Sequence, residues 1–254
     1  MVKQRLHYSV ALLLFLTTGI LNVKKKGNKM CFSASASFGA SAIIGAIGVL
    51  SIIKAKTTPL LLFASIPFIF SIQQLAEGLL WLSLNNNYSI AVQQFFVYSF
   101  LFFAMVLWPV WIPVSMLVLE KNARYKKIKF MLLITGIIVA AGSAVMLLLY
   151  PVNVVNTFHH LHYKFNLPVS AHFLIWTFNI LYFIATVIPP FISGIKKMYW
   201  LGIIFLLSCF FAVVFYDGFI VSVWCYFAAL LSIVVLIITS SIVKQPAEYK
   251  AKPY

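Results

Sequence analysis

Residues 130–150 read FMLLITGIIVAAGSAVMLLLY, and none of these side chains is charged. A helix of this length rises about 30 Å, which matches the thickness of the hydrocarbon core of a bilayer. The apolar side chains cover every face of such a helix, whereas a barrel strand would alternate polar and apolar residues over about 10 positions. This stretch therefore predicts a transmembrane helix.

Further stretches along the chain have the same character, and the composition agrees with them, since 63% of the 254 residues are hydrophobic and only 9% are charged. Such a composition excludes a soluble domain. We therefore expect an all-α integral membrane bundle in a domain of residues 30–243. The predicted transmembrane helices number seven: Ala34–Ile53, Leu60–Leu84, Ile90–Leu119, Phe130–Tyr150, His172–Ile192, Tyr199–Tyr216 and Phe219–Val243.

The 19 Lys and Arg residues against 4 acids give a net charge of +15. These cations lie in short clusters between the spans, which argues against a nucleic-acid partner and for loops that flank a bilayer. If the connections are assigned alternately to the two sides of the membrane, the connections on one side hold only Lys164. That side is predicted to be external, because basic residues are enriched in cytoplasmic loops. The first span then begins outside, and residues 244–254 form a basic cytoplasmic tail. The opposite side holds Lys54, Lys56, Lys121, Arg124, Lys126, Lys127, Lys129, Lys196, Lys197, Lys244, Lys250 and Lys252.

Residues 1–29 form a hydrophobic N-terminal extension that does not fit this topology. As an additional span, Tyr8–Val23 is short and would place a lysine cluster outside. As a signal peptide, it lacks an Ala-x-Ala-like cleavage site. The stretch KKKGNKM at 24–30 favours a third interpretation, a start codon assigned too early, because it back-translates into a purine-rich ribosome-binding site ahead of Met30.

Four motifs resemble one family. They are MCFSASASFGASAIIGAIGVL from Met30, IPFIFSIQQLAEGLLWL at 66–82, ATVIPPFISG at 185–194 and SVWCYFAALLS at 222–232. From Met30 to about Ile242 the chain is similar to DUF6629, an uncharacterised family of bacterial polytopic membrane proteins. The resemblance implies a multi-pass protein of a bacterial inner membrane and supports Met30 as the start. It implies no activity.

Polar residues inside spans are the main functional candidates, because a charge in hydrocarbon is costly unless it is paired or hydrated. Glu77 is the only Asp, Glu, Lys or Arg within the seven predicted spans. Gln73, Glu77 and Trp81 repeat every four residues and share one helix face, with Gln74 beside them. We expect this face to form an outward-facing ligand pocket in which Glu77 acts as a proton relay, binding group or catalytic base. A purely structural hydrogen-bond cluster explains the same residues.

The remaining titratable side chains are expected in the outer half of the bundle. His172 and Asp217 are candidate ligand-binding residues, although capping and turn formation account for them too. The loop Pro151–Ala171 is expected to roof the pocket with its histidines. Imidazole and thiolate groups are ligands for zinc or copper, and the candidate metal ligands are His159, His160, His162 and Cys31.

The spacing of these histidines does not match a helical His-Glu-x-x-His zinc motif, so interfacial histidines without a metal remain an alternative. Cys209 and Cys225 each lie eight residues from Asp217. They either pair as a disulfide or pack as small apolar side chains.

Three classes of function are compatible with this pattern. The first is a membrane-embedded enzyme or sensor that uses Glu77 with a metal or small ligand, for example a hydrolase of lipid-like substrates at the outer leaflet. The second is a transporter or channel for a small solute or proton, in which helices kinked at Pro109, Pro113 and Pro189-Pro190 provide gating. The third is a structural partner of other membrane proteins.

Overall fold

A computed structural model describes residues 34–157, 160–166, 168, 172–195, 197–215 and 220–244. The extension 1–29 and the tail beyond Lys244 lie outside the described residues, as do Cys31, His159 and Asp217. The expectations for these segments and side chains therefore stay predictions.

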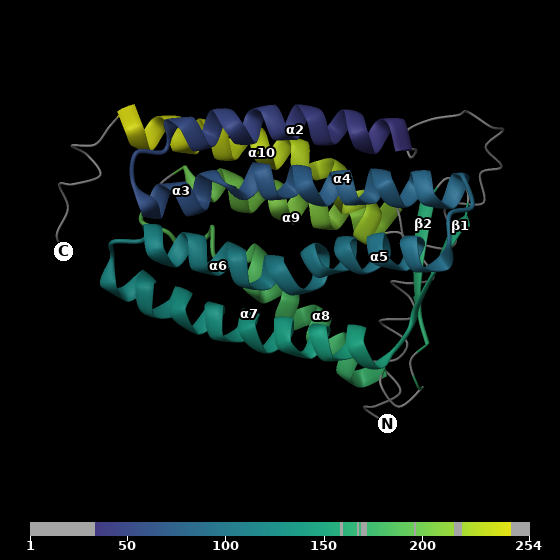
Figure 1. Cartoon of the computed structure of the whole chain (residues 1–254). Helices are drawn as coiled ribbons and strands as arrows, with labels where there is room; N and C mark the ends of the chain where they lie inside the picture. Colours follow the sequence, from purple (N-terminus) through teal and green to yellow (C-terminus); the bar gives the residue numbers. More distant parts are fainter. Residues whose placement is uncertain are drawn as a thin grey trace, which may run out of the picture.

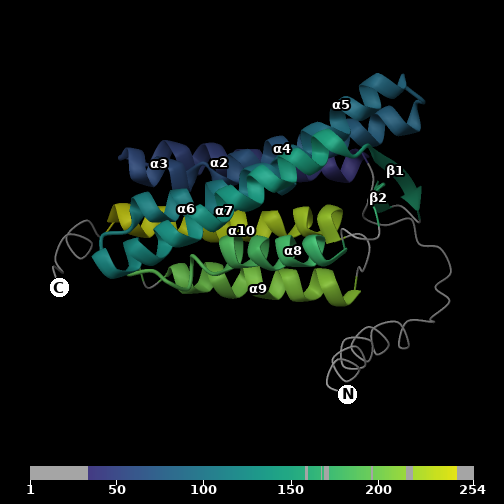
Figure 2. The same cartoon turned by 90° about the horizontal axis from the view of Figure 1, so that it is seen from below.

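The described chain forms a bundle of helices that run lengthwise, with a β-hairpin at one end (Figure 1). The view in Figure 2 shows the same helices from below, with α8, α9 and α10 on one side and α2, α3 and α4 on the other. The elements are α2 (Ala34–Lys54), α3 (Thr58–Ala64), α4 (Ile66–Asn85), α5 (Ile90–Leu101), the π-helical segment η1 (Phe102–Leu107), α6 (Trp108–Leu119), α7 (Ala123–Leu149), β1 (Val152–Thr157), β2 (His160–Phe165), α8 (His172–Val187), α9 (Met198–Phe215) and α10 (Ile220–Lys244).

The helical prediction is confirmed, since each predicted span is mostly helical over its described residues. Within the described residues, five helical stretches are long and apolar enough to cross a membrane: Ala34–Lys54, Thr58–Asn85, Ile90–Leu119, Ala123–Leu149 and Phe227–Lys244. Two further apolar helices, Phe173–Val187 and Met198–Phe211, are shorter. The number of seven spans and the sidedness of the termini remain predictions.

Two helix boundaries differ from the sequence expectation for local reasons. α7 begins at Ala123, not at Phe130, because the Asn122 side chain caps its first turn and accepts hydrogen bonds from the backbone N–H groups of Arg124 and Tyr125 at 3.0 and 3.2 Å. α8 ends at Val187, not at Ile192, because Pro189-Pro190 cannot continue the helix.

The described basic residues gather at the end of the bundle that lies away from the hairpin (Figure 1). Lys54 and Lys244 are the last residues of α2 and α10, and Arg124 lies in the first turn of α7. Lys164, on β2, lies at the opposite end. The fold therefore brings together at one end the connections that the sequence analysis assigned to one side of a membrane.

The connection after α7 is a β-hairpin where the sequence analysis predicted a loop. β1 and β2 pair antiparallel with Val155 opposite His162. The sequence His-Leu-His-Tyr-Lys-Phe at 160–165 alternates polar and apolar side chains, which is the pattern of a half-buried strand. Leu161 and Tyr163 are buried against the bundle, where the Tyr163 ring stacks on Phe100 with the ring centroids 5.3 Å apart.

The predicted third span changes its helical geometry in the middle. In η1 the backbone N–H of Trp108 donates to the carbonyl of Phe103, five residues earlier. Pro109 follows at once and has no N–H to donate, and Pro113 lies inside α6. Irregular turns of this kind are usual where proline interrupts a membrane helix.

Pro113 determines how closely α7 packs against α6. Because it has no N–H, the carbonyl of Pro109 loses its partner within the helix. This carbonyl points at Gly136 of α7, where a Cβ atom would overlap the oxygen. Only glycine therefore allows the two helices to approach at this point.

We expect Gly136→Ala to destabilise the protein by about 1–3 kcal/mol, because the added Cβ forces α7 away from α6. The control is Gly39→Ala in α2, where nothing lies within 4 Å of the added atom; it should be neutral or mildly stabilising. Thermal unfolding of the purified variants in detergent micelles measures both. Equal midpoints for the two variants would contradict this account of the α6–α7 contact.

Candidate functional site

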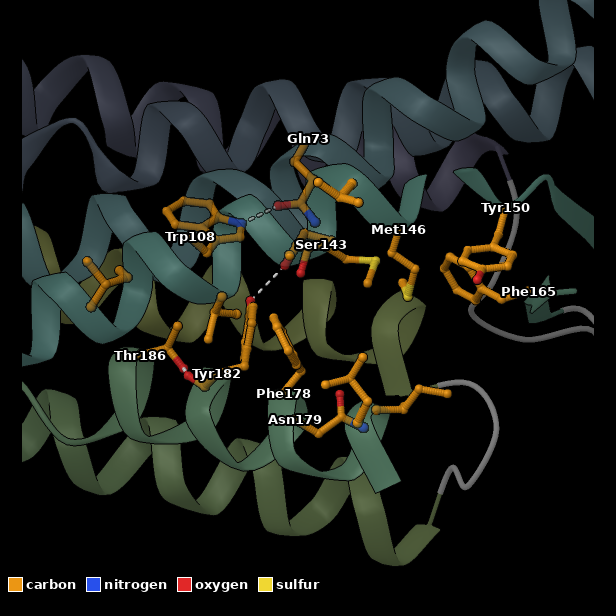
Figure 3. A pocket seen from close by; sticks show the side chains of 18 of the residues that line it. Gln73, Trp108, Ser143, Met146, Tyr150, Phe165, Phe178, Asn179, Tyr182 and Thr186 are labelled. Carbon is orange, nitrogen blue, oxygen red and sulfur yellow. Dashed lines mark hydrogen bonds between the residues drawn. The ribbon is translucent and has the colours of Figure 1, made fainter. Parts of the chain in front are cut away.

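A cavity of about 600 Å³ lies between α4, η1, α6, α7, α8 and α9 (Figure 3). Its deep end is lined by Ile112, Val139 and Phe205, and its other end by Tyr150 and Phe165 near the hairpin. The volume is in the range of small-molecule binding sites. The sequence analysis did not predict it, because it lies between helices that are distant in sequence.

The cavity opens to the outside between α7 and α8. Four of its described lining residues are themselves exposed: Val145 at 52% and Leu149 at 67% on α7, and Leu174 at 57% and Asn179 on α8. Deeper in the bundle the two helices are in contact, because a Cβ at Gly142 would overlap the Phe178 ring. The opening is therefore bounded mostly by apolar side chains, which face lipid if the bundle lies in a membrane, with the Asn179 amide among them.

One wall of the cavity is a buried hydrogen-bonded pair. Trp108 Nε1 donates to Gln73 Oε1 at 2.6 Å, and the Phe70 ring lies on Trp108 with the centroids 4.0 Å apart. Gln73 is only 3% exposed, and Figure 3 shows its amide nitrogen on the side turned toward Ser143 and Met146. Gln73 thus joins α4 to α6 and presents a polar atom to the cavity.

A second hydrogen bond crosses from α8 to η1. The Tyr182 hydroxyl donates to the Ala104 carbonyl at 2.7 Å. Continuation of the π-helical pattern would pair this carbonyl with the N–H of residue 109, which is proline. Tyr182 therefore replaces a backbone bond that Pro109 removes, and it fixes α8 against η1 beside the cavity (Figure 3).

We expect Tyr182→Phe to cost about 1–3 kcal/mol, because it leaves the Ala104 carbonyl without a donor in an apolar setting. Tyr199→Phe is the control, since Tyr199 is 55% exposed and its ring contact with Phe191 survives the change. Thermal unfolding in detergent compares the two. If both variants unfold like the wild type, the Tyr182–Ala104 bond does not hold α8 in place.

Further polar side chains line the cavity, among them Ser143 on α7 and Asn179 on α8. They flank the Gly142–Phe178 contact, each by one residue. Within the described part of the chain, neither the Ser143 hydroxyl nor the Asn179 amide has a hydrogen-bond partner. Ser143 is only 6% exposed, so its hydroxyl is a buried group that is available to a ligand.

The structure separates the residues of the predicted Glu77 pocket. Gln73 lines the cavity, but Gln74 and Glu77 do not. They form a pair of their own, in which Gln74 Nε2 donates to Glu77 Oε2 at 3.0 Å, and each is 1% exposed. Trp81 packs in an apolar cluster with Leu80 and Phe100. The catalytic and ligand-binding roles assigned to these residues remain predictions.

The candidate metal ligands lie mostly outside the described residues. The structure describes the backbone of His160 and His172 but not their side chains, and His159 and Cys31 are outside it altogether. His162 lies on β2 on the face opposite Leu161 and Tyr163. Among the described residues, no three His, Cys, Asp or Glu side chains come together as a metal site. Zinc or copper binding, like the role of Asp217, stays a prediction.

Cys209 has a free thiol in the structure and is partly buried in α9. Its proposed partner Cys225 lies in α10, where the side chain is not described. The described part of the pair therefore agrees with Cys209 as a packing residue, which is one of the two alternatives from the sequence.

Sequence reasoning missed a buried ion pair at the basic end of the bundle. Lys129 Nζ donates to Glu120 Oε2 at 2.7 Å, and the two side chains are 1% and 2% exposed. Glu120 Oε2 also accepts from the backbone N–H of Gly194 at 3.0 Å, and Glu120 Oε1 accepts from that of Asn122 at 3.0 Å. The pair therefore connects the α6–α7 turn to the α8–α9 connection. A signal existed, because Glu120 is one of only four acids in the chain.

Burial raises the pKa of the Glu120 carboxyl, but the hydrogen bonds from Lys129, Asn122 and Gly194 outweigh it and hold the pKa below the ordinary value. The folded state therefore prefers the carboxylate. Its contribution to stability is complete above the ordinary glutamate pKa of about 4.3 and is lost as the pH falls below that value through the folded pKa.

We expect Lys129→Met to destabilise the protein by about 3–5 kcal/mol at neutral pH, because it leaves a buried carboxylate without its cation. The double variant Glu120→Leu/Lys129→Met should regain most of that loss. Lys126→Met, at an exposed position on the same helix, is the control. Thermal unfolding measures all three, and a single Lys129 variant as stable as the control would show that the ion pair is not required.

The sequence model of one family, described as "Family of unknown function (DUF6629)", matches residues 30–251. The chain belongs to the DUF6629 family. This confirms the resemblance seen in the four sequence motifs. No curated protein and no solved structure matches the chain.

Proposed function

We propose that this DUF6629 protein is a multi-pass protein of a bacterial inner membrane that binds a small, mostly apolar ligand in the cavity between α7 and α8. The membrane location is supported by five helices of sufficient length and apolarity, and by the gathering of basic residues at one end of the bundle. Under the positive-inside rule, the basic end is cytoplasmic and the hairpin end is external.

The observation that carries the ligand proposal is the cavity itself. It has a volume of about 600 Å³, and its lining is predominantly apolar, with a few polar groups from separate helices. This combination is typical of sites for drug-sized ligands. A cavity so lined does not fill readily with water, because each buried water needs about two to four polar partners.

The position of the opening supports a ligand that arrives from the bilayer. Val145, Leu149 and Leu174 are exposed around it, and all three are apolar. In a membrane these side chains contact acyl chains, so a lipid-soluble molecule reaches the cavity without crossing water. Binding of such a ligand fits the first class of function from the sequence analysis, a membrane-embedded sensor or enzyme. The bound ligand would lie beside Gln73, which lines the cavity.

Glu77 has a supporting role in this proposal. It lies one helical turn from Gln73, accepts a hydrogen bond from Gln74 and does not line the cavity. Zinc or copper is not part of the proposal.

The proposal can be tested with a variant in which a larger side chain fills the cavity. Ile175→Trp adds bulk at a lining position of α8, and Ile180→Trp makes the same change at a position of α8 that is 54% exposed and outside the lining. Native mass spectrometry of protein extracted from its own membranes should show a small bound molecule in the wild type and in Ile180→Trp. Ile175→Trp should lose it.

Absence of any bound molecule from the wild type, or equal occupancy in the two tryptophan variants, would contradict ligand binding in this cavity. Thermal unfolding of both variants checks that a lost ligand reflects the blocked cavity and not a misfolded protein. Each variant adds one indole to the same helix, so the comparison is matched for size.

A further inference from the structure

We infer that the ligand of this cavity is an uncharged long-chain amphiphile, whose hydroxyl, ester or amide group hydrogen-bonds to Ser143 and Asn179 where α7 crosses α8. This inference rests on the proposed function and names the chemical class of its ligand. Three properties of the described residues lead to it.

The first property is the absence of charge. Among the described residues that line the cavity, none is Asp, Glu, Lys, Arg or His. A charged headgroup that entered would lose its hydration and gain no counter-ion, which costs several kcal/mol. Fatty acid anions, phosphate esters and ammonium lipids are therefore disfavoured, and a neutral polar group is favoured.

The second property is the pair of unpartnered polar side chains. The Ser143 hydroxyl and the Asn179 amide have no hydrogen-bond partner in the described part of the chain. Three other polar side chains of the lining already have partners, since Gln73 accepts from Trp108, Tyr182 donates to the Ala104 carbonyl and Thr186 donates to the Tyr182 carbonyl. The Ser143 hydroxyl is buried, and a buried hydroxyl without a partner is costly. Asn179 is exposed at the cavity opening, so a ligand that bonds to Ser143 and also reaches Asn179 gains more than a plain hydrocarbon would.

The third property is depth. Asn179 lies seven residues into α8, about 10 Å from the helix start at about 1.5 Å per residue. Ser143 lies six residues before the end of α7, at a similar depth of about 9 Å. Beyond them, Ile112, Val139 and Phe205 form an apolar deep end. A long chain fits there while the polar group stays at the level of Ser143 and Asn179.

The polar groups of the cavity therefore match those of a neutral amphiphile in hydrogen-bonding capacity. Asn179 offers a donor and an acceptor, and Ser143 offers a hydroxyl that can do either. A long-chain alcohol or a monoester of a polyol satisfies both. The exposed apolar residues at the opening, Val145, Leu149 and Leu174, allow such a molecule to arrive from the surrounding bilayer.

The test uses three photoactivatable probes with the same diazirine-bearing alkyl chain and different ends, namely an alcohol, a sulfonate and a trimethylammonium. The full-length protein in lipid nanodiscs is labelled with each, and the attachment sites are mapped by peptide mass spectrometry. We expect the alcohol to label cavity residues of α7 and α8 at least about tenfold more than either charged probe, since a difference of about 1.4 kcal/mol is sufficient.

Two conservative variants then test the polar contacts. Ser143→Ala and Asn179→Leu should each weaken cavity labelling by the alcohol about 3- to 10-fold, and should narrow its advantage over the charged probes. Thr135→Val and Thr177→Val are matched controls, because each removes a hydroxyl from α7 or α8 outside the lining. The controls should label like the wild type.

The outcomes separate the two proposals. If no probe labels the cavity, or Ile175→Trp leaves the labelling unchanged, both the proposed function and this inference fail. If all three probes label the cavity equally and Ile175→Trp blocks them, ligand binding stands and the preference for a neutral amphiphile is overturned. Alcohol labelling unchanged in both Ser143→Ala and Asn179→Leu would likewise overturn the assigned polar contacts.

Discussion

Two prolines in one membrane helix determine much of this structure, because each removes a backbone N–H that a carbonyl needs in an apolar medium. Pro109 leaves the Ala104 carbonyl to Tyr182 of α8, at 2.7 Å. Pro113 leaves the Pro109 carbonyl facing Gly136 of α7. The Tyr182–Ala104 hydrogen bond positions α8 against η1, and the Pro109–Gly136 contact positions α7 against α6. The cavity is the space that remains between α7, α8 and the helix formed by η1 and α6.

The two ends of the bundle are held in different ways. At the basic end, Glu120 and Lys129 are buried together, and the Gly194 N–H donates to the same carboxylate. This network fixes the α6–α7 turn against the α8–α9 connection. At the other end, the hairpin separates α7 from α8 along the chain and packs Tyr163 on Phe100. The helices are therefore tied together at the basic end, while the cavity opens toward the hairpin end.

The helical elements could be predicted from the sequence, because a run of about 20 uncharged apolar residues is compatible with a membrane helix and not with a barrel strand. The end of α8 at Val187 was missed, because the span was drawn through to Ile192 although Pro189-Pro190 cannot continue a helix. The hairpin was missed, although polar and apolar residues alternate from His160 to Phe165 as in a strand. The histidines of this segment were interpreted as metal ligands in a loop and not as the polar positions of a strand. The early start of α7 was missed because Asn122 and the lysines after it were read as a loop.

The candidate site was only partly predictable. The prediction that polar residues near Gln73 face the interior agrees with their burial, but Gln73 and Glu77, one turn apart, have different surroundings. The partners Trp108, Ser143, Asn179 and Tyr182 come from three other helices, and their proximity depends on tertiary packing that no local pattern encodes. Lys129 was placed outside the span because it was read as one of the loop cations, and its partner Glu120 lies nine residues away across a turn.

An experimental structure in lipid nanodiscs tests the central claim most directly, since the claim is that α7 and α8 enclose a ligand-sized cavity open to the bilayer. The account predicts an elongated density that passes Gln73, Ser143 and Asn179 and continues toward Val139 and Phe205. Contact between α7 and α8 along their whole length, with side chains filling the space and no density between them, would contradict it.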